Sequence, residues 1–421
     1  MQIVPICHWL YTRVPQSLLR RIEAANFIKT VRFVSEHSPF YKEAFRRRGI
    51  RAEKVRSPAD LGDFYTTAED IRTSPESFIC RKPDTAFETT GTTSARPKRV
   101  YFSRSEIREA GWSGAVGLWG IGVRPEDRVA SAFDYSFWVS GPVLAASCEA
   151  LGAFHVEAGR LDPAEFYERL KDYRISVIVG DPSWIVRLAE IAKEKGPWPV
   201  KLLLGGGENL TEEARAFVEG VWKADFFLSY GQTEAFGAIG LESRAKEGYH
   251  LNEFHNFFEI INPDAGGWGE LVYTTLNRRT MPLVRYRSGD LTRFLPPKGY
   301  PVRRIEKLKG RLDEWTPTAM GNIAPWMFEP FFKKVDGVDG DWQIVVAKRG
   351  TKDLIEFHVE TANGHETLQS QVFEAFRREW PEAWRVVEMG VFLMSVCPHA
   401  KGSLKTGRKL RRIVDRRDFT Q

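Results

Sequence analysis

The sequence lacks any apolar run close to the roughly 20 residues that a membrane-spanning helix needs, so we expect no transmembrane segment and no membrane partner. Its first 13 residues are partly apolar, but no basic stretch precedes them, which is not typical of a secretory signal peptide. The chain has only four cysteines, widely spaced and without a CxxC pair. Because this pattern argues against a disulfide framework, we expect a reduced, cytoplasmic protein.

The 421 residues also lack low-complexity tracts and internal repeats, and 43% of them are hydrophobic. This composition excludes global disorder and a repeat architecture, and the length favours two or three domains. The formal net charge of +6 is compatible with nucleic acid or with small polyanions. Basic residues gather between positions 401 and 417 without a recognisable RNA- or DNA-binding pattern. We therefore expect a small ligand rich in phosphate and no nucleic acid partner.

Between residues 99 and 213, strand-like and helix-like patterns alternate. Apolar runs of strand length occur at residues 99–102, 128–133, 175–179 and 201–204. Helix starts lie between them: Ser103 and Glu106 form a capping box, Asp162 precedes a proline at the first helical position, and Thr211 precedes two acidic residues. Strands that alternate with helices predict an α/β sheet covered by helices.

The flanking regions differ from this central pattern. Residues 18–33 have a helical pattern that ends before Pro39, and residues 259–273 resemble two strands joined by a Pro/Asp/Gly turn. Near the end, strand patterns and one helical pattern occur at residues 343–346, 354–359, 366–380 and 390–394. We predict an α/β protein with a large N-terminal domain, residues 1–312, of mixed sheets, helices and a small β-barrel-like subdomain. Residues 313–421 would form a small α+β domain.

A loop rich in threonine and glycine, residues 89–98, precedes the first of these strands. Threonine hydroxyls and backbone amides can surround phosphate oxygens, and Arg96 and Lys98 add positive charge. An ordinary polar hairpin turn explains this segment equally well.

A second motif, residues 230–234, follows the apolar strand 226–228. Strand ends are where α/β sheets bind ligands. Glu234 offers a hard oxygen ligand for Mg²⁺, Thr233 can hydrogen-bond a phosphate, and Tyr230 can stack on a purine. Taken alone, a surface turn with a solvated glutamate is the simpler interpretation.

Three further motifs lie at residues 286–290, 310–314 and 405–412. Asp290 follows a glycine and can accept hydrogen bonds from both ribose hydroxyls, although many Gly-Asp pairs are solvated turns. Lys409 can bridge a carboxylate and an α-phosphate as negative charge develops. A solvated basic tail is the alternative for this last motif.

In this order and at these separations, the five motifs resemble those of the adenylate-forming superfamily of acyl-CoA synthetases, adenylation domains and luciferases. Within the superfamily they are most similar to the phenylacetate-CoA ligase group. Residues 37–41, 57–61, 248–287 and 412–415 match that group as well. The resemblance runs from about residue 18 to residue 417.

The resemblance implies a role for each matched residue. Those implied to bind ATP or AMP are Thr89, Thr90, Gly91, Thr92, Thr93, Lys98, Gly207, Glu208, Asn209, Tyr230, Gly231, Asp290 and Arg311. Thr233 is implied to contact the α-phosphate, Glu234 to hold Mg²⁺, and Lys409 to catalyse adenylation. Asp313 is implied to be the hinge about which a mobile C-terminal domain turns.

Three positions depart from the family pattern. Ser94 and Ala95 stand where the family usually has a single glycine, which lengthens and stiffens the loop tip. Leu228 lies where relatives often place a polar residue against adenine, and Arg408 replaces the glycine that usually precedes the lysine. Because none of these changes removes a charged catalytic group, we expect an active enzyme.

Candidates for the acid-binding pocket are Phe133, Tyr135, Phe137, Trp138, Gly205 and Phe236. Aromatic walls suit a flat aryl or arylacetic acid. For Phe133 and Phe137, which share a face of the predicted strand, a place in the core is at least as good an interpretation. His250 and His255 are loosely spaced and have no cysteine nearby, which argues against a zinc site there.

The resemblance implies ATP-dependent activation of a small carboxylic acid to an acyl-adenylate, with Mg²⁺ and coenzyme A as the other cofactors. Pyrophosphate would be released and the acyl group transferred to the thiol of coenzyme A, with a carrier-protein phosphopantetheine or an amine as the alternative acceptor. A non-catalytic nucleotide-binding homologue is a further alternative. A homodimer is compatible with the resemblance.

Overall fold

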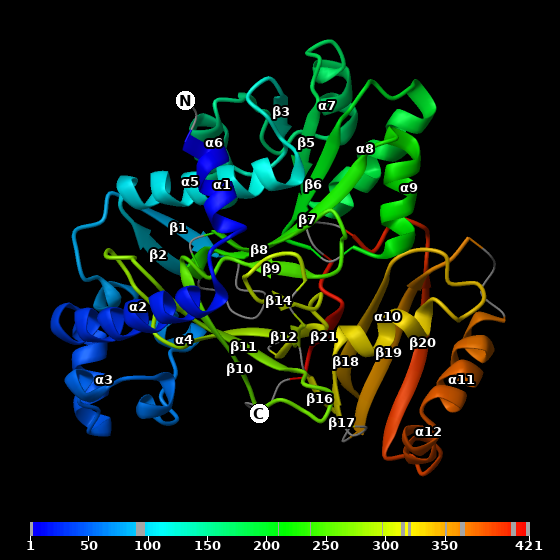
Figure 1. Cartoon of the computed structure of the whole chain (residues 1–421). Coiled ribbons are helices and arrows are strands. Elements are labelled where there is room, and N and C mark those ends of the chain that lie inside the picture. Colours follow the sequence, from blue (N-terminus) through cyan, green and yellow to red (C-terminus); the bar gives the residue numbers. More distant parts are fainter. Residues whose placement is uncertain are drawn as a thin grey trace. The chain divides into compact units, whose positions relative to one another are not determined.

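The computed structural model describes residues 3–89, 97–208, 210–235, 237–296, 298–312, 316–318, 321–349, 352–362, 367–405 and 410–417. Internal contacts divide the chain into two compact units (Figure 1). The N-terminal unit comprises Met1–Ser288 and Thr292–Leu308, and the C-terminal unit comprises Gly289–Leu291 and Lys309–Gln421. The predicted α/β class is confirmed. The domain boundary at residues 312 and 313 stays a prediction.

The N-terminal unit alternates helices and strands along much of its length. Its helices are α1 (Ile3–Tyr11), α2 (Gln16–His37), α3 (Pro39–Arg48), α4 (Ala68–Thr73), α5 (Arg104–Ile121), α6 (Ser140–Leu151), α7 (Pro163–Leu170), α8 (Pro182–Lys195) and α9 (Glu212–Trp222). The strands of its largest sheet are β3 (Arg128–Ser131), β4 (Phe154–Glu157), β5 (Val177–Gly180), β6 (Leu202–Gly206), β7 (Asp225–Gln232), β8 (Gly237–Glu242), β9 (Tyr249–Leu251), β13 (Phe294–Leu295) and β14 (Arg304–Ile305). Its other strands are β1 (Thr85–Thr89), β2 (Lys98–Phe102), β10 (Asn256–Ile261) and β11 (Gly269–Thr275).

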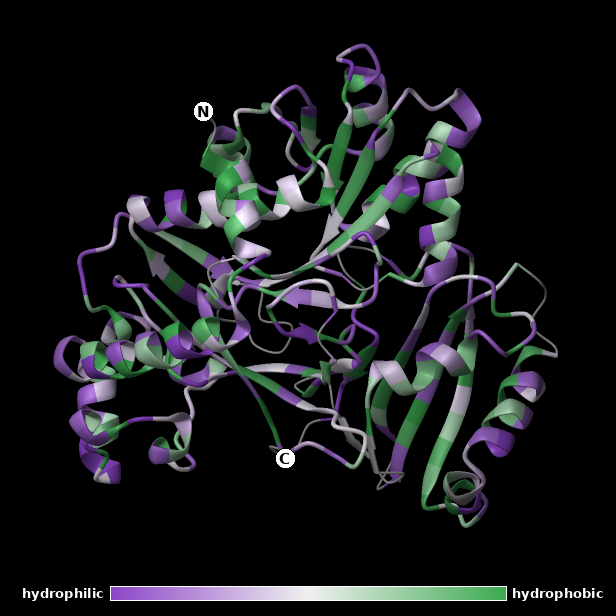
Figure 2. Ribbon diagram, viewed as in Figure 1, coloured by the Kyte–Doolittle hydropathy of each residue, from purple (hydrophilic) through white to green (hydrophobic). Residues whose placement is uncertain are grey.

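The largest sheet has the strand order β13-β14-β9-β8-β7-β6-β5-β3-β4. Strands β3 to β7 pair in parallel, and β8 pairs antiparallel with β7. Side chains alternate between the two faces: Val177 and Leu202 join the core beneath α5 and α6, whereas Ile178 joins the core beneath α7, α8 and α9. Because both faces of the sheet are buried, its parallel strands are nearly continuous apolar runs. Figure 2 shows these strands largely in green, the colour of hydrophobic residues.

The predicted helix starts are confirmed. The Ser103 hydroxyl accepts a hydrogen bond from the backbone N–H of Glu106 at 3.2 Å, and the Glu106 carboxylate accepts one from the N–H of Ser103 at 2.8 Å. The Asp162 side chain caps α7, and Thr211 caps α9. The break before Pro39 separates two helices, since α2 ends at His37 and α3 begins at Pro39.

Two antiparallel hairpins lie outside the largest sheet. Strands β10 and β11 pair from Asn256–Thr275 to Ile261–Glu270, which confirms the predicted pair of strands. Strands β1 and β2 pair so that Thr89 lies opposite Lys98. The two ends of the threonine-rich loop, Thr89 and Lys98, therefore lie side by side.

The C-terminal unit contains a smaller sheet with helices on one face. Its elements are β15 (Gly310–Arg311), β16 (Thr316–Thr318), β17 (Gly321–Ile323), α10 (Pro325–Phe332), β18 (Trp342–Arg349), β19 (Lys352–Glu360), α11 (Leu368–Glu379), α12 (Pro381–Glu388), β20 (Phe392–His399) and β21 (Ile413–Asp415). Strand β12 (Tyr286–Thr292) begins in the N-terminal unit, and its residues Gly289–Leu291 group with the C-terminal unit. The sheet order is β20-β19-β18-β21. Phe328, Phe331 and Phe376 pack with inward side chains of β18 and β19.

Two expectations from composition can be compared with this structure. None of the helices in the described ranges combines the length and apolar character that a membrane span requires. All four cysteines lie in the described residues, and each has a free thiol. The sequence did not predict α12 (Pro381–Glu388), which is separated from the end of α11 at Glu379 only by Trp380.

Candidate active site

The carboxyl ends of the parallel strands bring several predicted site segments to one edge of the sheet. Residues 133–138 follow β3, residues 207–208 follow β6, and residues 233–234 follow β7. Parallel pairing sets Gly205 opposite Leu228 and Gly206 opposite Ser229. Ligands of open α/β sheets bind outside this edge, so we take it as the frame of the candidate site.

Glu234 lies in a short 3₁₀ turn, Thr233–Ala235, directly after β7, and its side chain is buried. Lys98 forms an ion pair with Glu234 Oε1. The Tyr286 hydroxyl donates to the same oxygen at 3.0 Å and accepts a hydrogen bond from Lys98 Nζ at 3.1 Å. We call Lys98, Glu234 and Tyr286 the Glu234 cluster.

Electrostatics keep the Glu234 carboxylate ionised. Burial alone would raise the pKa of Glu234, but the positive charge and hydrogen bond of Lys98 and the hydrogen bond from Tyr286 outweigh it, so the pKa lies below its ordinary value. A buried carboxylate with a buried cation as its partner remains charged at neutral pH. This state is the one that can bind a divalent cation.

Arg278 fixes the backbone of the turn that carries Glu234. Its guanidinium donates to the carbonyl oxygen of Glu234 at 3.0 Å and to that of Tyr101 at 2.8 Å, and it stacks on the ring of Phe102. Burial lowers the pKa of Arg278 to about 10, which still leaves the group charged at neutral pH. Arg278 therefore positions the turn without itself presenting a charge to solvent.

The threonine-rich loop is anchored beside this cluster. Thr89 ends β1 opposite Lys98, and β1 contacts the turn that holds Glu234. The Thr89 hydroxyl oxygen is buried and makes no hydrogen bond to a described residue. Thr90, Gly91, Thr92 and Thr93, together with Ser94 and Ala95, lie outside the described residues.

The end of β6 and the residues after it are closely packed. A Cβ atom at Gly205 would lie 2.9 Å from Leu228 Cδ2 and 3.0 Å from Pro182 Cγ, so only glycine fits without movement of its neighbours. Gly207 adopts a φ of +90°, which also favours glycine. Glu208 accepts a hydrogen bond from the backbone N–H of Ser183 at 3.1 Å, which satisfies an amide in the first turn of α8. The predicted adenine contacts of Gly207 and Glu208 stay predictions, and Asn209 is not among the described residues.

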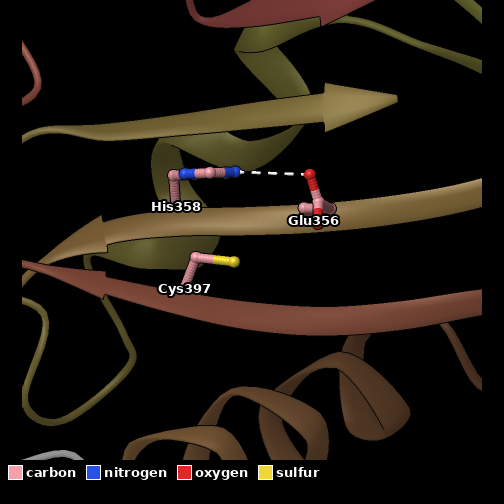
Figure 3. A group of neighbouring side chains, drawn as sticks. All are labelled: Glu356, His358 and Cys397. Carbon is pink, nitrogen blue, oxygen red and sulfur yellow. Dashed lines mark ion pairs between the residues drawn. The ribbon is translucent and has the colours of Figure 1, made fainter. Parts of the chain in front are cut away.

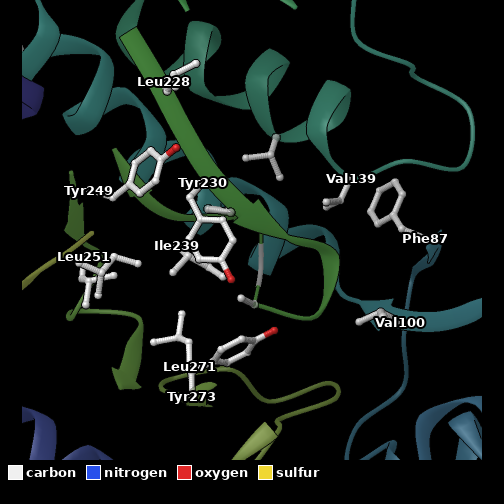
Figure 4. Packing of buried hydrophobic residues seen from close by; sticks show 14 of the residues in the cluster. Phe87, Val100, Val139, Leu228, Tyr230, Ile239, Tyr249, Leu251, Leu271 and Tyr273 are labelled. Atoms are coloured by element: carbon white, nitrogen blue, oxygen red, sulfur yellow. The ribbon is translucent and has the colours of Figure 1, made fainter. Parts of the chain in front are cut away.

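The residues at the end of β7 are partly core residues. Tyr230 is buried in the hydrophobic cluster that Figure 4 shows, with its ring centroid 6.0 Å from that of Tyr249. Gly231 lies so close to Gly237 that a Cβ atom would be 2.4 Å from its carbonyl oxygen. Leu228 is fully packed in the sheet, and Thr233 is buried next to Glu234. The packing of these residues holds the end of β7, and with it the turn that carries Glu234, in place.

The aromatic segment after β3 differs from its prediction. β3 ends at Ser131, so Phe133 and Phe137 do not share a strand face. Phe137 is 62% exposed, and the interpretation of it as a core residue is therefore wrong. Phe133 is half-buried and packs on the core beneath α5 and α6.

Tyr135 and Trp138, in the same segment, are half-buried. The Tyr135 hydroxyl contacts the Ser131 hydroxyl and lies 3.3 Å from Nε2 of His155. Burial lowers the pKa of His155 to about 4, so this imidazole is neutral near pH 7. Tyr135 is thereby tied to β3 and β4. Phe236, the remaining aromatic candidate for the pocket, falls outside the described residues.

In the C-terminal unit, Asp290 and Arg311 lie directly opposite each other on β12 and β15. Arg311 donates to Asp290 Oδ1 at 3.1 Å, and Asp290 is only 2% exposed. A buried aspartate held by an arginine is not a solvated turn residue. Asp313, Arg408 and Lys409 lie outside the described residues, so their predicted roles stay predictions.

The sequence did not identify Tyr286 as a member of the Glu234 cluster or Arg278 as the residue that holds its backbone. Tyr286 was part of a motif but received no role, and Arg278 was not singled out. The first could have been found from its place at the start of the 286–290 motif. The second has no local signal, because Arg278 reaches Glu234 only through the tertiary fold.

Comparison with known proteins agrees with this arrangement. The family described as AMP-binding enzyme matches residues 51–253. A phenylacetate-coenzyme A ligase of Thermus thermophilus is 28% identical, with 96% of this chain and 98% of that protein covered. One from Pseudomonas putida is 27% identical, with 81% of this chain and 82% of that protein covered. A crystal structure of 2-hydroxyisobutyryl-CoA ligase with 2-HIB-AMP has a TM-score of 0.79 at 22% identity, covering 96% of this chain and 91% of the other.

The fold and the match over residues 51–253 make the chain similar to AMP-binding, adenylate-forming enzymes. Over most of its length the chain is similar to phenylacetate-coenzyme A ligases.

Proposed function

We propose that this protein activates a carboxylic acid with ATP, releasing pyrophosphate, and then transfers the acyl group to the thiol of coenzyme A. The observation that carries the proposal is the ionised, buried Glu234 at the carboxyl end of β7, held by Lys98 and Tyr286. Similarity to two proteins named phenylacetate-coenzyme A ligase supports it.

The residues around Glu234 fit a role in binding Mg·ATP. A Mg²⁺ ion that keeps waters and phosphate ligands needs only one or two protein carboxylates. Glu234 would hold it through its carboxylate, beside Lys98 and Tyr286. When bound, the ion would neutralise charge on the phosphates. The buried Thr89 hydroxyl, which makes no hydrogen bond to a described residue, is available to a phosphate oxygen beside the cluster.

In the first half-reaction, a carboxylate oxygen of the acid attacks the α-phosphorus of ATP, and the bond to pyrophosphate breaks. The protein contributes position and charge rather than covalent chemistry. We assign the phosphates to the loop of residues 89–93, with Thr233 and Lys409 at the α-phosphate. The ribose is assigned to Asp290, which Arg311 orients.

In the second half-reaction, the sulfur of coenzyme A attacks the acyl carbon, the bond to AMP breaks, and the thiol proton leaves to solvent. We propose that the two half-reactions use different placements of the C-terminal domain, with Asp313 as the hinge. A change of domain placement is an established way to run two reactions in one site.

For the acid, we propose an aryl or arylacetic compound. Phe137 is exposed after β3, and Phe133, Tyr135 and Trp138 belong to the same segment. These aromatic side chains suit a flat apolar ring. The names of the relatives point to phenylacetate as the first acid to test. The test is pyrophosphate release with a panel of aryl, arylacetic and aliphatic acids, each with and without coenzyme A. An aliphatic acid as the best substrate would contradict this part of the proposal and leave the activity intact.

The role of Lys409 is tested by separating the half-reactions. Lys409→Ala should lose adenylate formation by roughly a hundredfold or more while it largely retains thioester formation from supplied acyl-adenylate. Lys401→Ala, which alters an exposed lysine of the same basic run, is the matched control and should behave as the unaltered protein. Equal loss of both half-reactions in Lys409→Ala would contradict the assignment.

A further inference from the structure

The sheet of the C-terminal unit has one apolar and one polar face. On β19, Ile355, Phe357 and Val359 are buried against the helices of this unit. Glu356 and His358 alternate with them and therefore lie on the opposite face. This second face carries a group of side chains for which the proposed ligase reaction has no use.

Strand pairing brings four of these side chains together. Strands β19 and β20 are parallel, with His358 opposite Cys397 and Glu360 opposite His399. One ligand atom each of Glu356, His358 and Cys397 lies within 4.8 Å of the others, and all three residues are half-buried. Figure 3 shows the imidazole of His358 directed toward the Glu356 carboxylate, with Cys397 on the adjacent strand.

The hydrogen bonding of His358 leaves one ring nitrogen unused. Its Nδ1 lies 2.8 Å from Nε2 of His399, while its Nε2 is buried and makes no hydrogen bond to a described residue. The distance from this Nε2 to Glu356 Oε2 is 3.6 Å. If Nδ1–H donates to His399, the lone pair of Nε2 points toward the carboxylate.

We propose that Glu356, His358 and Cys397 bind a zinc ion, with His399 as the residue that orients His358. An imidazole nitrogen, a thiolate and a carboxylate are the ligand types of zinc, whereas Mg²⁺ and Ca²⁺ prefer oxygen alone. Three protein ligands leave a fourth tetrahedral position for water. A histidine that binds a metal commonly donates its second N–H to a neighbouring acceptor, which is the place of His399 here.

The geometry requires only a small contraction. Zinc bonds of about 2.0–2.3 Å place tetrahedral ligand atoms about 3.5 Å apart, and the three atoms here lie within 4.8 Å of one another. The ligands come from two adjacent strands of one sheet, so side-chain rotation can supply this movement. The ion would join β19 to β20.

A hydrogen-bonded chain is the competing explanation. In that case His399 donates to Nδ1 of His358, and Nε2–H of His358 points to Glu356. Such a chain needs no cysteine, because the contacts of His358 with Glu356 and His399 do not involve Cys397. The contribution of Cys397 therefore separates the two explanations.

The experiment measures zinc retained by the full-length protein. The protein is stripped with a chelator, loaded with Zn²⁺ and desalted, and bound metal is determined by elemental analysis. Loading with Co²⁺ in parallel reports a thiolate ligand through a sulfur-to-cobalt charge-transfer band. The variants are Cys397→Ser and His358→Ala, with Cys80→Ser and His37→Ala as matched controls elsewhere in the chain. Circular dichroism checks that each variant is folded.

We expect about one zinc per chain in the unaltered protein and in both controls, with loss in Cys397→Ser and His358→Ala. His399→Ala should weaken zinc binding by about 10- to 100-fold without abolishing it. The cobalt band should appear in the unaltered protein, a result that does not depend on whether any variant folds. Absence of retained zinc and of the cobalt band, or equal zinc retention by Cys397→Ser, would overturn the proposal. Neither result would bear on acid activation.

Discussion

The Glu234 cluster and the group formed by Glu356, His358 and Cys397 differ in how deeply their side chains are buried. In the N-terminal unit, the side chains of Lys98 and Glu234 are 10% and 4% exposed, and both contact the buried Tyr286. In the C-terminal unit, the side chains of His358 and Glu356 are 17% and 23% exposed, and a buried nitrogen of His358 makes no hydrogen bond to a described residue. Loss of one member of the first cluster would leave a buried charge without its partner, whereas the second is the place where we propose a zinc ion.

The largest effect should follow from removing one charge of the Glu234 cluster. Lys98→Ala leaves a buried carboxylate without its cation, and we expect the free energy of unfolding to fall by about 3–5 kcal/mol. Urea unfolding measures the change. Arg46→Ala, which breaks the exposed Arg46–Glu43 pair, is the control and should cost less than about 1 kcal/mol.

A double variant sharpens this prediction. Lys98→Met with Glu234→Gln removes both charges and should recover most of the stability that Lys98→Ala loses, because no unpaired charge stays buried. If Lys98→Ala is no more destabilising than Arg46→Ala, the buried pair is not a structural unit.

A smaller loss is expected from filling the glycine at the end of β6. Gly205→Ala places a Cβ 2.9 Å from Leu228 Cδ2, and such overpacking should cost about 1–3 kcal/mol in unfolding free energy. Gly220→Ala is the matched control, because a Cβ there meets no atom within 4 Å. In the helix α9 this control should raise stability by up to about 1 kcal/mol. Equal effects of the two substitutions would show that the sheet edge is not tightly packed.

The Glu234 cluster should also give the N-terminal unit a pH dependence. Since the pKa of Glu234 is lowered by folding, its stabilisation is fully present above the ordinary pKa of a glutamate and is lost as the pH falls through the folded value. The stability of the unaltered protein should therefore fall more steeply on acidification than that of Glu234→Gln. Parallel stability–pH curves would contradict an ionised Glu234.

The smallest effect is predicted for the second cluster without metal. His358→Ala removes one hydrogen bond between two half-buried imidazoles, so the metal-free protein should lose only about 1 kcal/mol. At zinc concentrations about 100 times the dissociation constant, the difference between the two proteins should grow by about 2.7 kcal/mol. Thermal unfolding with and without zinc measures both values. A difference that does not depend on zinc would favour the hydrogen-bonded chain.

The fold could be predicted from local signals where those signals agree. The capping pair Ser103 and Glu106, the proline after Asp162 and the apolar strands of the central sheet all formed as expected, since caps and continuous apolar runs depend on near neighbours. The strand after residue 128 was predicted two residues too long. Apolar pattern alone does not mark where strand pairing stops. Phe137 lies beyond the end of β3 and is exposed, so the interpretation of it as a core residue on that strand was wrong.

The candidate site could be predicted only in part. The order of motifs indicated Glu234 and Asp290, but not that Lys98 pairs with Glu234, which depends on the packing of β2 beside the turn after β7. The cluster on β19 and β20 has a sequence signal, an alternation of Glu356 with His358 and of Cys397 with His399. Whether these side chains meet depends on the parallel register, which sets His358 opposite Cys397. Strand alternation alone does not reveal this register.

The most direct test of the account is acid-dependent pyrophosphate release by the unaltered protein and by Glu234→Gln across a range of Mg²⁺ concentrations. The account predicts release only with ATP, Mg²⁺ and a carboxylic acid together, and a loss of roughly a hundredfold in Glu234→Gln that higher Mg²⁺ partly restores. Release by Glu234→Gln that equals the unaltered protein at every Mg²⁺ concentration, or no release by the unaltered protein with any acid, would contradict it.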